Sequence, residues 1–280
     1  MTNILEAIYN IVIQKNFKIK DLYSGRNRAN GMGDALENYI KDAFADTFTI
    51  HQEIERMKIF NEKFSWLGSQ NNPPDIMIKN GDAIEVKKTQ SATSGLALNS
   101  SYPKADLRNT SPMITKECKE CEDWEIKDLI YCVGHTNDTD LKSLWMVYGN
   151  IYAAKLETYE RIKNTISSGI KTIQNVIFSE TKELGRVNRV DPLGITNLRI
   201  RGMWQIENPR KVFDYLHPQN NSSFELVAII PINKYKSFPN QSIKKIESLI
   251  NNNFTIEDTN VKDPNNPAKL IEVKLIKFTA

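Results

Sequence analysis

Apolar residues recur at helical spacing in two segments near the start of the chain. Ile4, Ile8 and Ile11 predict a helix within residues 1–14. A second amphipathic helix is expected from about Asp34 to Ala45, where one stripe contains Leu36, Tyr39, Ile40, Ala43 and Phe44. Further helices are predicted at 157–173 and 240–252.

Runs rich in β-branched and aromatic residues predict strands between and after these helices. The expected strands fall within 48–60, 75–79, 83–88, 128–134, 143–148, 197–201, 224–230 and 269–278. Asn- and Pro-rich stretches at 217–223 and 263–267 predict loops. This order of elements indicates a mixed α/β fold. Because neither an internal repeat nor a low-complexity linker is visible, we expect a single domain over residues 1–280.

Two of the expected strands flank Asn80-Gly81, a strong hairpin signal. A two-residue loop there would mix polar and apolar side chains on both faces. A three-residue loop from Lys79 to Gly81, with Gly81 left-handed, separates them and pairs Asp75 with Glu85. One face then contains Ile76, Ile78, Ile84 and Val86, and the other contains Asp75, Met77, Ala83, Glu85 and Lys87.

The polar face of this hairpin carries a candidate reactive group. Asp75 and Glu85 would face each other at about 5 Å between Cβ atoms, with Lys87 two residues further along the same face. Two carboxylates at that distance repel each other unless a cation neutralises them. In proteins, a hard divalent cation is the usual ion bound between such oxygen ligands. The lysine could then help to deprotonate a metal-bound water. A surface hairpin with a cross-strand Glu–Lys pair is the alternative interpretation.

Composition narrows the class of protein. The chain has 280 residues, 40% apolar and 25% charged, which is typical of a soluble globular protein. No run approaches the ~18 apolar residues of a membrane span, and the first residues lack the basic segment of a signal peptide. Three cysteines fit a reducing compartment, so we expect a cytoplasmic protein. A net charge of +3 excludes a polybasic coat for nucleic acid and a strongly acidic protein.

The arginines are distributed unevenly. Five of the ten lie between Lys182 and Lys211, where seven basic residues stand against three acids, a net charge of +4. An arginine fork suits phosphate groups and guanine edges, so this segment is a candidate nucleic-acid contact. A solvated basic face with intramolecular ion pairs is the alternative.

The sequence leaves open a zinc site, because the spacing of Cys118, Cys121, Cys132 and His135 could suit that metal. Cys132 lies in an expected buried strand, however, where cysteine is often only a small apolar residue.

A family resemblance is carried by the same hairpin. Pro74-Asp75 followed by Glu85-Val86-Lys87 matches the PD-(D/E)xK nuclease motif, which is loose when taken alone. The longer strings at 68–76 and 81–88 are more specific, and the chain resembles the NgoPII-type family of type II restriction endonucleases. The likeness continues through 27–30, 33–37, 97–104, 159–165, 181–195 and 198–204, and so covers most of the chain up to about residue 210.

The resemblance implies a restriction-endonuclease-like α/β core, with a mixed central sheet flanked by helices and a basic DNA-recognition lobe. It implies a catalytic core at about 30–180, a recognition segment at about 181–215 and a C-terminal α/β portion at 216–280. The implied activity is Mg²⁺-dependent cleavage of both strands of a short palindromic DNA site, GGCC. The implied partners are a second copy of the chain and, in function only, a cognate DNA methyltransferase.

Carried over by position, the resemblance makes Asp75 and Glu85 the metal ligands and Lys87 the residue that activates the water. The Val86 carbonyl is a further possible ligand. Glu37 is a candidate fourth catalytic residue, because some nucleases of this fold add an acid from the preceding helix. An exposed helix acid beside an apolar stripe is the alternative interpretation of Glu37.

The basic segment supplies the candidate DNA contacts. Arg199 and Arg201, two apart in an expected strand, would point to one face, and a GGCC half-site offers two adjacent guanines. We expect at least two of Arg186, Asn188, Arg189, Arg199 and Arg201 to touch bases and others to touch phosphate. Candidate contacts to the DNA backbone are Lys104, Ser101 and Arg28. The alternative interpretation places these residues in ordinary polar loops. A structure-specific nuclease and a non-cleaving DNA-binding protein remain the competing functions.

Overall fold

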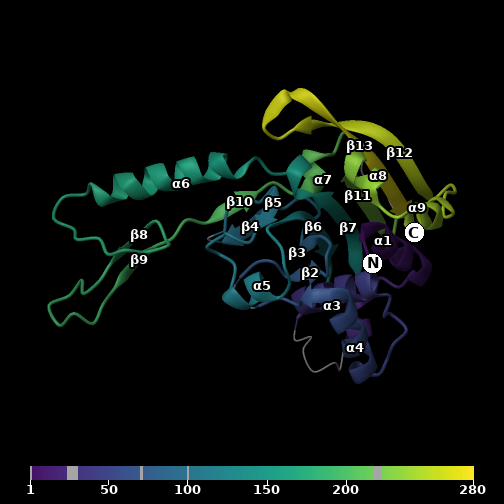
Figure 1. Ribbon diagram of the computed structural model, residues 1–280, viewed down its shortest axis with the longest axis horizontal. Coiled ribbons are helices and arrows are strands. Elements are labelled where there is room, and N and C mark those ends of the chain that lie inside the picture. The colour runs from purple at the N-terminus through teal and green to yellow at the C-terminus, as the bar shows by residue number, and fades with distance from the viewer. Residues whose placement is uncertain (1, 24–30, 70–71, 100, 217–221) are drawn as a thin grey trace.

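A mixed β-sheet forms the centre of the molecule in the computed structural model, which describes residues 2–23, 31–69, 72–99, 101–216 and 222–280 (Figure 1). Within these residues the sheet has nine strands. Its order is β1 (Phe64–Trp66), β2 (Ile76–Ile78), β3 (Ala83–Thr89), β6 (Ile126–Thr136), β7 (Leu141–Tyr148), β11 (Glu225–Pro231), β13 (Asn266–Thr279) and β12 (Phe254–Asp263). The short strand β5 (Asp106–Arg108) also pairs with β6.

The strand directions make this a mixed sheet, as the family resemblance implied. β3 runs parallel to β6 and β7 runs parallel to β11, whereas the other neighbours are antiparallel. The central strands are buried along nearly their whole length, and β11 contains the apolar run Leu226–Ile230. Strands covered on both faces read as continuous apolar runs because no side chain on them meets water. The strand predicted at 269–278 lies within the longer strand β13. Its long hairpin partner β12 was not predicted.

Helices from the N-terminal part of the chain pack together beside the sheet. They are α1 (Ile4–Gln14), α2 (Ile19–Tyr23), α3 (Met32–Ala45) and α4 (Glu53–Lys63). The predicted stripe of α3 is buried, and Leu36 packs so closely on β6 that a Cβ at Gly134 would lie 2.6 Å from its side chain. The absence of a side chain at Gly134 therefore lets α3 approach the strands that carry the site described below.

The strand predicted within 48–60 was wrong, because most of that segment forms α4. The run Phe48-Thr49-Ile50 resembles a strand, but the residues after it are strong helix formers and Glu53 and Glu55 occupy the first turn, where the helix dipole favours acids. Only Arg56 and Phe60 of α4 are buried, at the i, i+4 spacing of one helical face.

The remaining short helices connect the strands. They are α5 (Lys116–Glu120), the 3₁₀ helix η1 (Gly149–Ile151), α7 (Pro209–Val212), α8 (Ile232–Ser237) and α9 (Asn240–Glu247). The helix predicted at 240–252 ends at Glu247, because the chain turns through Ser248–Ile250 before β12 begins. Within the described residues, no helix has both the length and the apolar character needed to cross a membrane.

A long arm projects from the sheet in Figure 1. It contains α6 (Leu156–Lys171) and the antiparallel pair β8 (Gly185–Val187) and β9 (Leu198–Ile200), and we call residues 156–203 the arm. None of the described residues of α6 is buried. At the base of the arm, β10 (Trp204–Ile206) pairs with β4 (Leu96–Asn99). The predicted helix at 157–173 and strand at 197–201 are both confirmed, and both belong to this arm.

Candidate active site

The hairpin of β2 and β3 has the three-residue loop predicted from polarity. Met77 pairs with Ala83 and Ile76 pairs with Ile84, so Asp75 is aligned with Glu85 one step beyond the ladder. The loop conformation differs in one detail from the prediction. Asn80, at φ 55°, takes the left-handed conformation that was expected of Gly81. Asparagine tolerates this conformation better than most residues do.

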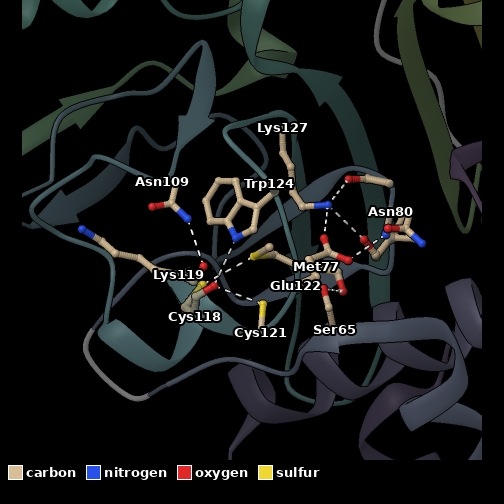
Figure 2. A network of polar contacts seen from close by, with 12 residues as sticks. Ser65, Met77, Asn80, Asn109, Cys118, Lys119, Cys121, Glu122, Trp124 and Lys127 are labelled. Carbon is tan, nitrogen blue, oxygen red and sulfur yellow. Dashed lines mark hydrogen bonds and ion pairs between the residues drawn. The ribbon is translucent and has the colours of Figure 1, made fainter.

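The turn of this hairpin is tied to the neighbouring segment by charged groups, as Figure 2 shows. Lys127 donates to the carbonyls of Gly81 and Ile78, at 2.7 and 3.3 Å, and forms an ion pair with Glu122. Glu122 in turn accepts a hydrogen bond from the backbone N–H of Asn80 at 2.8 Å. The loop therefore has little freedom, and the register that brings Asp75 opposite Glu85 is held from outside the sheet as well as within it.

The three residues of the nuclease-like motif meet on one face of the hairpin. Asp75 Oδ2 accepts a hydrogen bond from the Val86 N–H at 2.7 Å. Lys87 Nζ lies 2.6 Å from Glu85 Oε1, and the two side chains are 24% and 14% exposed. A partly buried ion pair of this kind holds the ammonium group beside both carboxylates rather than free in solvent.

Burial and mutual repulsion shift the proton equilibria of this group. Burial, followed by the charge of Glu85, raises the pKa of Asp75 to about 7. Burial alone would lower the pKa of Lys87, but the charges of Glu85 and Asp75 raise it above its ordinary value. The site thus has more negative charge than one lysine balances, and a cation bound between the carboxylates would relieve that excess.

Glu37 lies close enough for its charge to act on this group. It raises the pKa of Asp75 and of Lys87, in each case as the smallest of the causes. Its side chain is 33% exposed and pairs at 2.5 Å with Lys41, which also donates to the Leu67 carbonyl at 3.2 Å. Helix α3 therefore brings Glu37 to the edge of the site, with its carboxylate engaged by a lysine of its own helix.

The donor set fits a hard divalent cation. Within the described part of the chain, no group of three or more His, Cys, Asp and Glu side chains gathers in a way that could hold a metal. The protein would thus contribute two carboxylates, from Asp75 and Glu85, and not three. Water, the Val86 carbonyl or a substrate oxygen would complete the coordination shell. Mg²⁺ is commonly bound in this way, through one or two carboxylates, several waters and a phosphate.

Lys104 is a second lysine at the site. Its side chain lies inside the protein, donates to Ser101 Oγ, and donates to the Tyr102 carbonyl at 3.3 Å. Burial lowers its pKa to about 8 despite the opposing charge of Glu85. The loop that carries Lys104 packs so tightly on Gly149 that a Cβ there would lie 2.5 Å from the Lys104 carbonyl. From the sequence, Lys104 was a candidate contact to the DNA backbone with a polar loop as the alternative. The structure makes it a buried cation near the carboxylates.

A cleft of about 910 Å³ joins the carboxylate group to the arm. Its floor includes Asp75, Glu85 and Lys87. Ser101 and Lys104 line the same cleft, and its arm side is lined by Lys163, Lys182, Glu183, Arg199 and Arg201. The two arginines predicted to share a face do so, since both contact Glu183. The sequence did not single out Lys163, Lys182 and Glu183 as site residues, because their positions in the cleft depend on how the arm is placed in the tertiary structure.

The other predicted DNA contacts lie elsewhere. Arg186 in β8 faces Arg199 across the ladder and donates to Asn188 Oδ1 at 2.8 Å. Asn188 and Arg189 are exposed beyond the end of β8 and do not line the cleft. Arg28 lies outside the described residues.

An aromatic cluster supports the base of the arm. Trp204 packs edge-on against Tyr102 and Tyr159, with ring centroids 6.3 and 5.7 Å apart, and those two tyrosine rings stack on each other. Because Tyr102 precedes Lys104 by two residues, this cluster connects the arm directly to the loop that carries the buried lysine. Trp204, which begins β10 directly after the arm, also lines the cleft.

The cysteines are used for packing in the described structure. Cys118 is buried at 3.4 Å from Met77 Sδ, while Cys121 donates to the Cys118 carbonyl at 3.1 Å (Figure 2). Cys132 is buried in the middle of β6 between Val86 and Met146. Burial raises the pKa of Cys118 to about 12, so its thiol stays protonated at neutral pH. The zinc arrangement left open by the spacing does not form among the described residues.

Comparison with known proteins identifies the family. The model of the NgoPII restriction endonuclease family matches residues 2–262. The type II restriction enzyme NgoPII of Neisseria gonorrhoeae is 48% identical over 278 residues, which cover 99% of each chain. No solved structure matches the chain. A family match and an identity of this extent cover the hairpin, the cleft and the arm together, and the chain therefore belongs to the NgoPII restriction endonuclease family and is a type II site-specific deoxyribonuclease.

Proposed function

We propose that this enzyme makes Mg²⁺-dependent cuts in both strands of DNA at the palindromic site GGCC, by the chemistry of the PD-(D/E)xK nucleases. The observation that carries the proposal is the composition of one cleft. Its floor contains two facing acids with a lysine, and its wall contains two exposed arginines. Hydrolysis of a phosphodiester and recognition of guanine need these two sets of groups within reach of one DNA duplex.

Asp75 and Glu85 would hold the ion, with the Val86 carbonyl as a further ligand. When bound, Mg²⁺ lowers the pKa of a coordinated water and offsets charge on the phosphate. Lys87, held 2.6 Å from Glu85 as a charged ammonium group, would orient the attacking water or stabilise the developing charge. Lys104 and Ser101 would contact the phosphate beside the cut. Glu37 would act from the rim of the site by adding negative charge that strengthens cation binding.

Arg199 and Arg201 are the proposed readers of guanine, because a guanidinium can donate to O6 and N7 together. Arg186, Asn188 and Arg189 are the proposed phosphate contacts on the more exposed part of the arm, and Arg28 is assigned the same role. The recognition segment at 181–215 would thus work beside a catalytic core at about 30–180, with 216–280 completing the sheet of a single domain.

The enzyme would act as a homodimer, because a two-fold protein matches a two-fold site and brings one active site to each strand. A DNA methyltransferase of the same restriction-modification system would protect host DNA. We also propose a cytoplasmic location, since the three cysteines are free and the substrate is intracellular or invading DNA.

The test is digestion of unmethylated phage DNA with the purified protein in Mg²⁺, followed by sequencing of the fragment ends. The proposal expects discrete fragments that end at GGCC, complete loss of cleavage in EDTA and recovery when Mg²⁺ is added back. Nicking that follows DNA structure, fragments that end at a different sequence, or binding without cleavage would each contradict it.

A further inference from the structure

One carboxylate in the cleft engages both candidate guanine-reading arginines. Glu183 accepts two hydrogen bonds from Arg199, with Nε at 2.9 Å and Nη2 at 2.7 Å. It accepts a third from Nε of Arg201 at 2.5 Å. The glutamate side chain is 14% exposed, whereas each arginine side chain is 53% exposed. The carboxylate therefore lies beneath the two guanidinium groups, and the arginines cover it on the side of the solvent.

The position of Glu183 is set by the backbone around it. The next residue, Leu184, donates from its N–H to the Ile200 carbonyl at 3.1 Å, which ties this loop to the strand between the two arginines. The Leu184 carbonyl accepts from Ser167 Oγ of α6 at 2.9 Å. The Glu183 N–H itself donates to Thr181 Oγ1 at 3.1 Å. Contacts from both α6 and β9 thus fix the carboxylate, and it can in turn restrict two flexible side chains.

The donors that remain on the arginines are those required to read guanine. A guanidinium carries five N–H donors, and Glu183 uses the Nε side of each group. The Nη1–Nη2 end of each arginine is left for a second acceptor. Two donors on one end match the O6 and N7 acceptors of a guanine. Binding to Glu183 and binding to guanine are therefore compatible, and the carboxylate does not have to be displaced.

The same contact reduces the attraction of this surface for DNA of any sequence. Two guanidinium groups and one carboxylate carry a net charge of +1 instead of +2. Hydrogen bonds from Arg199 and Arg201 hold the pKa of Glu183 below its ordinary value, so the carboxylate stays charged at neutral pH. Non-specific affinity depends mainly on how many phosphates a protein neutralises. A fixed negative charge beneath the arginines lowers that number without removing the donors that face the bases.

We propose that Glu183 is a specificity-determining residue, which positions Arg199 and Arg201 for guanine and suppresses their binding to phosphate. This inference rests on the proposed function, because it assumes that these two arginines read bases. Glu183 would be a positioning residue that acts through the arginines and has no contact with the reacting atoms.

The test measures binding in EDTA, by fluorescence anisotropy, to a duplex that contains GGCC and to one with a scrambled site, over a series of salt concentrations. The variant is Glu183→Gln, which keeps the size of the side chain and removes the charge. On scrambled DNA we expect tighter binding and a salt dependence steeper by about one phosphate contact, a change of about 0.9 in the log–log slope. We expect the preference for GGCC to fall by about tenfold, since bidentate contacts carry most of the discrimination.

Two further variants show whether the effects come from the charge and position of the Glu183 carboxylate or from a general change in the fold. Glu257→Gln removes an acid of β12 that pairs with Lys277, outside the recognition segment and the cleft, so it should bind like the wild type. Glu183→Asp keeps the charge and should retain the wild-type salt dependence. Thermal unfolding of each variant verifies that the fold is intact.

The outcomes distinguish this inference from the proposed function. If the wild type does not prefer GGCC, the proposed site is wrong, and the salt dependence on scrambled DNA still tests the role of Glu183. If the wild type prefers GGCC but Glu183→Gln matches Glu257→Gln in both salt dependence and preference, the inference about Glu183 is overturned. A loss of affinity by Glu183→Gln for both duplexes equally would also overturn it, because that result would assign Glu183 only a structural role.

Discussion

The carboxylate of Asp75 accepts a hydrogen bond from the backbone N–H of Val86 at 2.7 Å, across the hairpin that carries both candidate metal ligands. This bond orients Asp75 toward the face of β3 that displays Glu85 and Lys87. It uses one oxygen of the carboxylate, so the other oxygen remains to meet a cation. The distance between the two acids is therefore set by the hairpin register and not by the flexibility of either side chain.

Replacing Asp75 by Asn should abolish cleavage and preserve DNA binding. The amide oxygen can still accept the hydrogen bond from Val86, so the hairpin should keep its shape, but the charge that holds the cation is lost. We expect cleavage to fall by at least about a hundredfold, because a bound ion contributes several kcal/mol of charge stabilisation. Cleavage of a GGCC plasmid and anisotropy on a GGCC duplex measure the two effects. Asp106→Asn, in an acid that pairs with Arg108, is the matched control, and residual wild-type cleavage by Asp75→Asn would refute the metal assignment.

The charge of Lys104 should make DNA binding sensitive to pH between 7 and 9. Burial lowers the pKa of Lys104 to about 8, with Glu85 opposing and Lys87 reinforcing that shift. The ammonium form predominates below that pH, so the free enzyme loses this positive charge as the pH rises, from about nine-tenths charged at pH 7 to about one-tenth at pH 9. The dissociation constant for DNA should therefore increase by up to about tenfold over this range.

The variant Lys104→Arg tests the origin of this pH dependence. A guanidinium stays charged throughout the range, so the dissociation constant should become nearly independent of pH. Lys104→Met should bind weakly at every pH, which provides a check if arginine does not fit the buried position. An unchanged pH profile in both variants would show that another group is responsible.

Removing Arg201 or Arg199 should weaken recognition of the site more than binding to random DNA. If the residue contacts guanine through two hydrogen bonds, its replacement by Ala should cost about 1–3 kcal/mol on the GGCC duplex. Anisotropy on specific and scrambled duplexes provides the comparison. Arg161→Ala, in an exposed arginine of α6 that does not line the cleft, serves as the control. An equal loss on both duplexes would identify the residue as a phosphate contact.

The buried pair Arg56–Asp42 should be required for stability. Arg56 Nε lies 2.6 Å from Asp42 Oδ1, and Tyr23 and Thr47 also donate to this carboxylate, at 2.6 and 2.5 Å. Arg56→Met would remove a buried positive charge that pairs with Asp42, and breaking a buried pair costs about 3–5 kcal/mol. Urea denaturation measures the free energy of unfolding, and Arg161→Met is the exposed control. A loss below about 1 kcal/mol would mean that Asp42 is satisfied without Arg56.

Local patterns in the sequence were sufficient to predict the elements that carry the candidate catalytic residues. The alternation of apolar and polar residues on either side of Asn80-Gly81 predicted the pairing of Met77 with Ala83, because any other register would expose one apolar face. The stripe of α3 was equally clear. The strand predicted within 48–60 was wrong because it also relied on a local pattern. A short apolar run near Phe48 does not by itself distinguish a strand from the start of a helix.

The sequence by itself therefore determined the hairpin, the group of Asp75, Glu85 and Lys87, and the family. The tertiary structure decided which charges share a cleft. It placed Lys104 inside the protein, and Arg210 forms a buried ion pair with Glu225, so one arginine of the basic segment is internal. It also brought Glu183 under Arg199 and Arg201, 16 and 18 residues away in the chain. Periodicity reports only the side of an element that a residue occupies, whereas burial and ion pairing depend on segments that meet only when the whole chain has folded.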